Sequence, residues 1–151
     1  MKKFKLTSEF IVDISGVKLF RIKALIEFGN VKAGDLGGYI EKEENLSHMG
    51  NAWVSGDARV SGNARVSGDA QVFGDARVSG DKDYAYAHGF GSCNRTTTFF
   101  RLKDGDVGVR CGCFYGTLAQ FRDNVCETHG ETKKAQEYLM LADLMDFRFK
   151  N

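Results

Sequence analysis

The chain has 151 residues, of which 42% are hydrophobic and 27% charged, and its formal net charge at pH 7 is +1. These values are ordinary for a globular protein, and so small a net charge argues against nucleic acid as a partner on electrostatic grounds. No apolar run approaches the roughly 20 residues of a membrane-spanning helix, and the basic start lacks the apolar core of a signal peptide. We therefore expect a cytoplasmic protein without membrane contact.

The N-terminal segment has strand character. Residues 10–12 and 17–22 are rich in apolar and β-branched side chains, and the segment Asp13-Ile14-Ser15-Gly16 between them is typical of a hairpin turn. Residues 34–38, Gly-Asp-Leu-Gly-Gly, form a turn-rich lead into the next region. We assign residues 1–37 to an N-terminal β cap on the repeat that follows.

A six-residue repeat dominates the middle of the chain. Residues 50–79 hold five copies of Gly-(Asn/Asp)-Ala-x-Val-(Ser/Phe), a decayed copy follows at 80–85, and Leu46 and Ile40 continue the phase upstream. Ala and Val, two positions apart, point to the same side of an extended segment, and the Gly-Asp and Gly-Asn pairs favour sharp corners. A short strand and a corner every six residues predict a solenoid over residues 38–90.

The repeat resembles the hexapeptide-repeat family, in which an aliphatic residue is followed four positions later by a small one. Four pairs match this pattern: Val54 and Ala58, Val60 and Ala64, Val66 and Ala70, and Val72 and Ala76. The resemblance implies a mainly β fold, a short left-handed parallel β-helix of two to three coils with about three repeats in each. The N-terminal β cap and a C-terminal β-hairpin plus two α-helices would flank it.

If three repeats make a coil, residues 18 apart stack on one another. The expected outward columns are Glu41, Arg59 and Arg77; Ser47, Arg65 and Asp83; and Trp53 and Gln71. The expected inward column is His48, Val66 and Tyr84. For His48 we favour a place at the end of the core over a catalytic role.

Residues 91–151 form a different, C-terminal region. Residues 96–102 and 107–111 predict a hairpin around Asp104-Gly105. Thr117 and Gln120 have the spacing of a helix capping box, and Gly130 is a suitable helix end. A second helix should begin near Thr132, and its apolar stripe is broad enough to suggest burial against both its own domain and a partner subunit. Ordinary core packing with surface leucines is the alternative.

The four cysteines form no Cys-x-x-Cys pair. Cys111 and Cys113 lie two apart, so on a strand they would share a face. They could join a metal site only with further ligands such as Cys93 or a histidine, and buried small apolar residues are the better interpretation. We expect no metal and no cofactor.

Most of the chain resembles small phage and prophage hexapeptide-repeat proteins. The similar stretches are residues 32–41 (KAGDLGGYIE), 44–47, 50–54, 91–100 (GSCNRTTTFF) and 112–117. A phage-encoded protein would act in the host cytoplasm.

Our first functional hypothesis is a non-catalytic binding protein. A homotrimer, which the family resemblance implies, would have three equivalent clefts between neighbouring solenoids. Stacked arginines suit phosphate or carboxylate groups. The expected ligand-binding residues are Arg59, Arg77, Trp53, Arg65, Arg95 and Thr97. The ligand would be a negatively charged nucleotide-derived molecule, in a phage setting a host immune signal. The alternatives are an ion-paired column, for instance Arg59 with Glu41, and a subunit contact for Trp53.

Two further hypotheses belong to other classes. An acyltransferase using acyl-CoA would need a histidine base, and His88 is the candidate because it leaves the repeat at an expected loop. The short repeat offers little groove for such a substrate. An inhibitor that binds a host defence protein could use the broad apolar stripe of the last helix.

Overall fold

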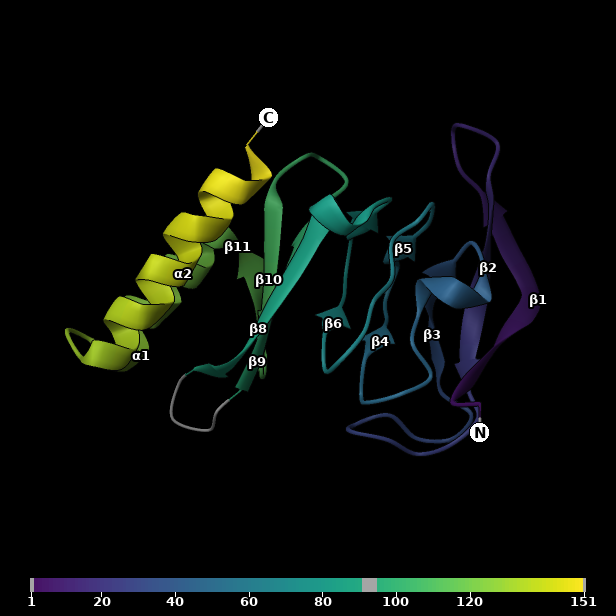
Figure 1. The fold of residues 1–151 in the computed structure, drawn as a ribbon, viewed down its shortest axis with the longest axis horizontal. Helices are drawn as coiled ribbons and strands as arrows, with labels where there is room; N and C mark the ends of the chain where they lie inside the picture. Colours follow the sequence, from purple (N-terminus) through teal and green to yellow (C-terminus); the bar gives the residue numbers. More distant parts are fainter. Residues whose placement is uncertain (1, 91–94, 151) are drawn as a thin grey trace.

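The fold has three parts along its longest axis (Figure 1). The computed structural model describes residues 2–90 and 95–150, with the side chain of Arg95 left out. An N-terminal hairpin lies at one end, the short strands of the repeat lie in the middle, and a sheet with two helices lies at the other end (Figure 1). No helix among the described residues is long and apolar enough to cross a membrane.

The N-terminal hairpin and part of the repeat share a five-stranded sheet of order β1-β2-β3-β5-β7. Its strands are β1 (Phe4–Val12), β2 (Lys18–Ala24), β3 (Leu36–Ile40), β5 (Arg59–Val60) and β7 (Arg77–Val78). The first three pair antiparallel, whereas β3, β5 and β7 pair parallel. The turn between β1 and β2 is held by Asp13, whose carboxylate accepts hydrogen bonds from the amides of Ser15 (2.9 Å) and Val17 (3.0 Å).

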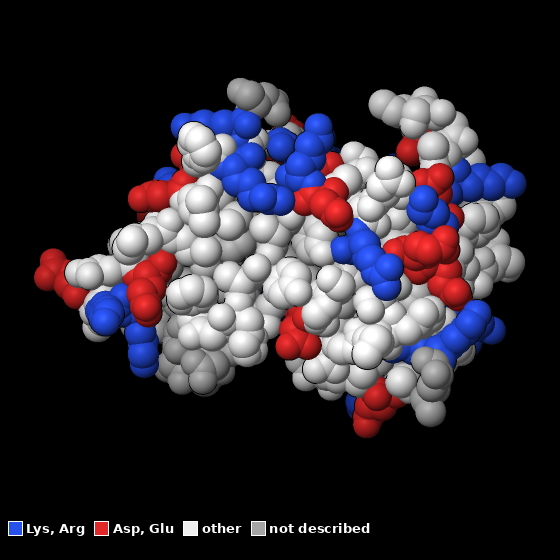
Figure 2. Space-filling view, in the orientation of Figure 1, with Lys and Arg blue, Asp and Glu red and all other residues white. Residues whose placement is uncertain are grey.

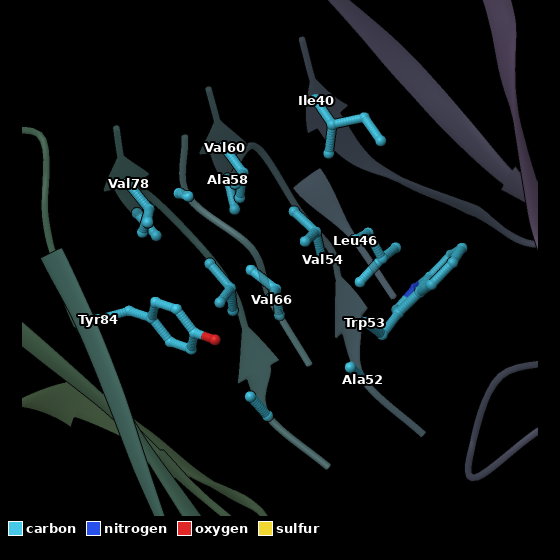
Figure 3. Packing of buried hydrophobic residues seen from close by; sticks show 14 of the residues in the cluster. Ile40, Leu46, Ala52, Trp53, Val54, Ala58, Val60, Val66, Val78 and Tyr84 are labelled. Atoms are coloured by element: carbon cyan, nitrogen blue, oxygen red, sulfur yellow. The ribbon is translucent and has the colours of Figure 1, made fainter. Parts of the chain in front are cut away.

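A second side of the repeat carries a separate two-stranded parallel sheet of β4 (Trp53–Val54) and β6 (Gln71–Val72). A third side carries a parallel bridge between Leu46 and Val66. The alanines and valines of the repeat point inward and are almost wholly buried, with Val54, Val60, Val66 and Val78 gathered in one cluster (Figure 3). Trp53 points to the opposite side of its strand from Val54 (Figure 3).

The C-terminal part is a four-stranded antiparallel sheet of order β11-β10-β9-β8. Its strands are β8 (Tyr84–Phe90), β9 (Arg95–Arg101), β10 (Val107–Cys111) and β11 (Phe114–Thr117). Helices α1 (Leu118–His129) and α2 (Lys133–Phe149) pack on it and form a second core with it. The sheet meets the repeat where the Gln71 amide donates to Thr98 Oγ1 (2.9 Å) and the Lys103 amide to the Asp75 carbonyl (3.0 Å).

Local signals in the C-terminal sequence are confirmed. Thr117 and Gln120 form the capping box at the start of α1, and Gly130 caps its end with a positive φ of 60°. The hairpin around Asp104-Gly105 joins β9 to β10. Thr132 caps α2 by accepting a hydrogen bond from the Ala135 amide.

The predicted fold class is wrong. The described residues form a mixed α and β structure with three separate open sheets and two helices, not a left-handed parallel β-helix. The physical reason lies in the lengths of the strands. The repeat strands β4 to β7 are two residues long each, whereas the flanking strands are longer and pair antiparallel, so they set the architecture on both sides of the repeat.

Two finer predictions are corrected. Arg59 pairs with Tyr39 on β3, which lies two residues before Glu41, the partner that an 18-residue step predicts. The step differs here because the copies of the six-residue repeat upstream of residue 50 are irregular. Leu46, not His48, lies beside Val66. His48 instead stacks on Phe4 (ring centroids 4.2 Å apart), at the end of the repeat.

Candidate anion-binding cleft

Arg59 and Arg77 lie side by side on the five-stranded sheet. Strands β5 and β7 pair in parallel with Arg59 opposite Arg77 and Val60 opposite Val78, the register that an 18-residue step demands. Neighbouring strands are about 4.8 Å apart, so the two arginine side chains project from the same face of the sheet on adjacent strands. The valines that alternate with them point into the core and fix this orientation.

The two arginines line a cleft of about 470 Å³, which we call the Arg59–Arg77 cleft. This volume lies in the range of small-molecule sites. The other lining residues are Asp13, Ile14, Leu19, Ser61, Val78, Ser79 and Lys103. The β1–β2 turn brings Asp13 and Ile14 to one side, and the β9–β10 turn brings Lys103 to the other (Figure 1). Figure 2 shows the hollow between these two projecting turns, at the top of the view.

Among the described residues, no ion pair joins Arg59 or Arg77 to an acidic side chain. The alternative interpretation, an ion pair of Arg59 with Glu41, is not formed, and the Glu41 carboxylate instead accepts from the Gly62 amide (2.8 Å). The Arg59 Nε atom is buried and has no hydrogen-bond partner in the described part of the chain.

Arg77 is held more firmly. Its Nη1 atom donates to the carbonyls of Asp57 (3.1 Å) and Ala76 (2.9 Å). Burial lowers the pKa of Arg77, the Arg59 guanidinium beside it lowers that pKa further, and the charges of Asp75 and Asp57 oppose the shift in part. The guanidinium stays charged at neutral pH, since arginine pKa values lie far above 7. Two like charges held this close favour an anion between them.

The remaining polar groups complete the site. Ser61 and Ser79 follow their arginines by two positions and both line the cleft, but the Ser79 hydroxyl already donates to the Asp83 carboxylate (2.9 Å). Lys103 adds a third cation, and its Nζ atom is 3.9 Å from Asp75. The Asp13 carboxylate is already engaged: hydrogen bonds from the Val17 amide, then from Ser15, lower its pKa.

The structure places the other predicted ligand residues elsewhere. Trp53 is 4% exposed and packs edge-on against Phe28 (5.2 Å between ring centroids), so its ring is not open to a ligand. Arg65 lines a different hollow, beside Tyr84 and Tyr86. Thr97 is fully buried and donates to Cys111 Sγ (3.3 Å).

The candidate catalytic residue is also placed differently from expectation. His88 lies within β8 rather than in a loop, and its Nδ1 atom is 2.8 Å from Thr96 Oγ1. The side chain of Arg95 lies outside the described residues, as does Cys93.

The other cysteines do not share a face. Cys111 is buried at the end of β10, whereas Cys113 is exposed in the turn that it forms with Gly112. Across the described residues, no group of three potential metal ligands comes together.

Sequence reasoning missed Lys103, Asp13 and the two serines. The serines had a signal, since the two-residue spacing after each arginine repeats in the sequence. Lys103 and Asp13 had none, because each belongs to a hairpin far from the repeat and reaches the cleft only through tertiary packing.

A second surface feature is apolar. Phe90, Lys133, Glu137, Met140, Leu141 and Leu144 line a groove of about 600 Å³ along α2. Met140, Leu144 and Phe147 are 70%, 55% and 77% exposed, so α2 keeps an apolar stripe without cover from the rest of the described chain.

Comparison with protein families gives one match. A family model described as YdcK Beta solenoid repeat matches residues 58–72 and 70–81. Both stretches lie inside the six-residue repeat, so the match supports a repeat of the β-solenoid type over this part of the sequence. No curated protein matches the chain.

Proposed function

We propose that this chain is a non-catalytic binding protein, which holds a negatively charged, nucleotide-derived small molecule in the Arg59–Arg77 cleft. The observation that carries the proposal is the pair of adjacent arginines without a carboxylate partner among the described residues, in a cleft of ligand size. Guanidinium groups bind phosphate through parallel charge-assisted hydrogen bonds. A bound anion would supply the buried Arg59 Nε with the acceptor it lacks.

The proposal has a narrower form, which rests on the sequence resemblance to small phage hexapeptide-repeat proteins. In that form the chain is a homotrimer in the host cytoplasm and sequesters a nucleotide signal of host immunity. The residues that line the cleft come from one chain, whereas the resemblance implies clefts between neighbouring subunits, and both arrangements predict one ligand per chain.

Native mass spectrometry of the protein purified from its host tests the proposal. We expect a releasable nucleotide-like mass in the wild-type protein and its loss in Arg59→Gln and Arg77→Gln. Arg122→Gln is the matched control, because Arg122 pairs with Asp143 on the helices and removal of an exposed pair costs at most about 1 kcal/mol. Full retention of the ligand by both cleft variants would contradict the proposal.

A second candidate function is inhibition by docking on a host defence protein. The exposed stripe of Met140, Leu144 and Phe147 favours it, since large exposed apolar patches mark interaction sites. A pull-down from host lysate with wild-type protein and Leu144→Glu tests it: a partner that both proteins capture equally would rule out this surface.

A further inference from the structure

We infer that copies of this chain assemble head to tail, with the β1–β2 hairpin of one copy docked in the apolar groove along α2 of the next. The inference rests on the homotrimer in the narrower form of the proposed function, and it names the two surfaces that join the subunits. It follows from two uncovered apolar surfaces at opposite ends of the molecule, from their dimensions and from the charges beside them.

The β1–β2 hairpin carries the first surface. Phe10 pairs with Phe20 and Val12 with Lys18 across the two strands, so these side chains share one face of the hairpin. Phe10 and Val12 are about half exposed, and Ile14 at the turn is fully exposed. A fully exposed isoleucine is unusual in a turn, where glycine and small polar residues dominate. We call Phe10, Val12, Ile14 and Lys18 the hairpin face.

The groove along α2 is the second surface. Met140, Leu141 and Leu144 line it from the helix, and Phe90 lines it from the end of β8. From Lys133 to Leu144 the groove follows about three turns of the helix, roughly 16 Å. An extended strand from Phe10 to Ile14 is at most roughly 13 Å long, so the hairpin face fits along the groove.

The two surfaces cannot meet within one chain, because the hairpin and α2 lie at opposite ends of its longest axis (Figure 1). A contact between the hairpin of one copy and the groove of another is heterologous, and such contacts close into rings or continue as open chains. A trimer is the ring closed by three of them. A two-fold contact of α2 with α2 would instead stop at two chains and leave the hairpin face uncovered.

The charges favour the head-to-tail contact. The hairpin holds Lys18 on its apolar face and Asp13 at its turn, and the groove holds Glu137 and Lys133. None of the four has an ion-pair partner among the described residues. Lys18 lies over the Phe10 ring (4.7 Å), and Asp13 accepts hydrogen bonds within its turn, so Lys18 is the freer of the two.

The order of these groups is the same along both surfaces. The hairpin presents Asp13, then Lys18, then Phe10 with increasing distance from its turn. The groove presents Lys133, then Glu137, then the apolar side chains from Met140 onward. One orientation therefore brings Lys18 of one copy to Glu137 of the next while the apolar parts face each other. Exposed pairs of this kind select an orientation more than they add affinity.

A mixture of two single variants tests the inference. Val12→Glu disrupts the hairpin face and keeps the groove, whereas Leu144→Glu disrupts the groove and keeps the hairpin face. Native mass spectrometry of the ligand-free chain should show a trimer for the wild type and a monomer for each variant alone. The mixture should form a one-to-one heterodimer, because one intact hairpin face meets one intact groove. Met49→Glu, at an exposed site on neither surface, is the control and should stay trimeric.

The alternatives give different results. A trimer that survives Val12→Glu, or a mixture without heterodimer, would overturn the inference. Disruption by Leu144→Glu alone would mean that the groove takes another surface, such as a second α2. A wild-type monomer would count against both the inference and the homotrimer. It would leave the anion proposal standing, since Arg59 and Arg77 belong to neither surface.

Exchange of two charges provides an independent test that does not disturb the apolar contact. Lys18→Glu and Glu137→Lys, each alone, should raise the dissociation constant of the trimer several-fold, because like charges then face each other. Both changes together in one chain should bring the constant back toward the wild-type value, since the pair is restored with reversed signs. Additive weakening in the double variant would contradict the pairing of Lys18 with Glu137.

Discussion

At the scale of single residues, Lys3 is unusual because it is a charged side chain that is only 1% exposed. Its Nζ atom donates to the carbonyls of Ala52 (2.6 Å) and Gly50 (3.4 Å) and lies 4.7 Å above the Phe28 ring centre. Burial lowers the pKa of Lys3 from 10.5 to about 8, and the distant charge of Asp69 opposes this shift only in part.

This lowered pKa predicts that stability rises with pH. Below pH 8, Lys3 is protonated in both the folded and the unfolded chain, so the cost of burying its charge is fully present. Between about 8 and 10.5, the unfolded chain binds a proton that the folded chain has lost, so the free energy of unfolding increases across this window.

Urea unfolding of the wild type and Lys3→Met at pH 7 and pH 10 checks this prediction. We expect the wild type to gain stability relative to the variant between the two pH values, since other titrating groups are common to both. A difference in unfolding free energy that stays constant with pH would show that Lys3 is not the group responsible.

At the scale of elements, the stacked strands depend on glycine at their corners. Gly62 has a φ of 62°, and a Cβ atom added there would lie 2.4 Å from the carbonyl oxygen of Ser79 on the next rung. Both the backbone conformation and the close approach of the rungs therefore exclude a side chain.

Gly62→Ala should destabilise the chain by about 1–3 kcal/mol, measured by thermal or urea unfolding. Gly80→Ala is the matched control, because the φ of Gly80 is −162° and an added Cβ atom would meet nothing within 4 Å. Equal unfolding free energies of the two variants would mean that the backbone at Gly62 can move away from Ser79 without loss of stability.

Helix α2 shows that one element can carry two apolar stripes. Ala135, Tyr138, Ala142, Met145 and Phe149 are buried against the C-terminal sheet and α1. Met140, Leu144 and Phe147 form a second stripe, which stays exposed. The breadth of the apolar face was clear in the sequence, and the structure shows that a single chain buries only one side of it.

At the scale of the whole molecule, the exposed stripe bears on the assembly. We expect native mass spectrometry to find a trimer. If α2 forms the contact between subunits, Leu144→Glu should shift the trimer toward monomer, because burial of an unpaired carboxylate in that contact is costly. Gln136→Glu, on an exposed part of the same helix, is the control. A wild-type monomer would contradict the trimer, whereas a trimer unaffected by Leu144→Glu would place the contact elsewhere.

The sequence by itself determined the local and periodic features of this protein. The six-residue repeat specified the buried Ala and Val positions, the glycine corners and the stacking of Arg59 on Arg77, because these depend on residues at fixed short spacings. The capping box at Thr117 and the hairpin turn at Asp13 are equally local.

Only the tertiary structure decided the architecture and the shape of the cleft. The repeat strands pair into two open sheets, since long flanking strands with no repeat of their own pair antiparallel on either side. Asp13 and Lys103 are 90 positions apart in sequence and reach the same cleft through packing of two separate hairpins. Contacts between segments this far apart in sequence form only when the two hydrophobic cores pack. The spacing of residues along the chain does not predict that packing.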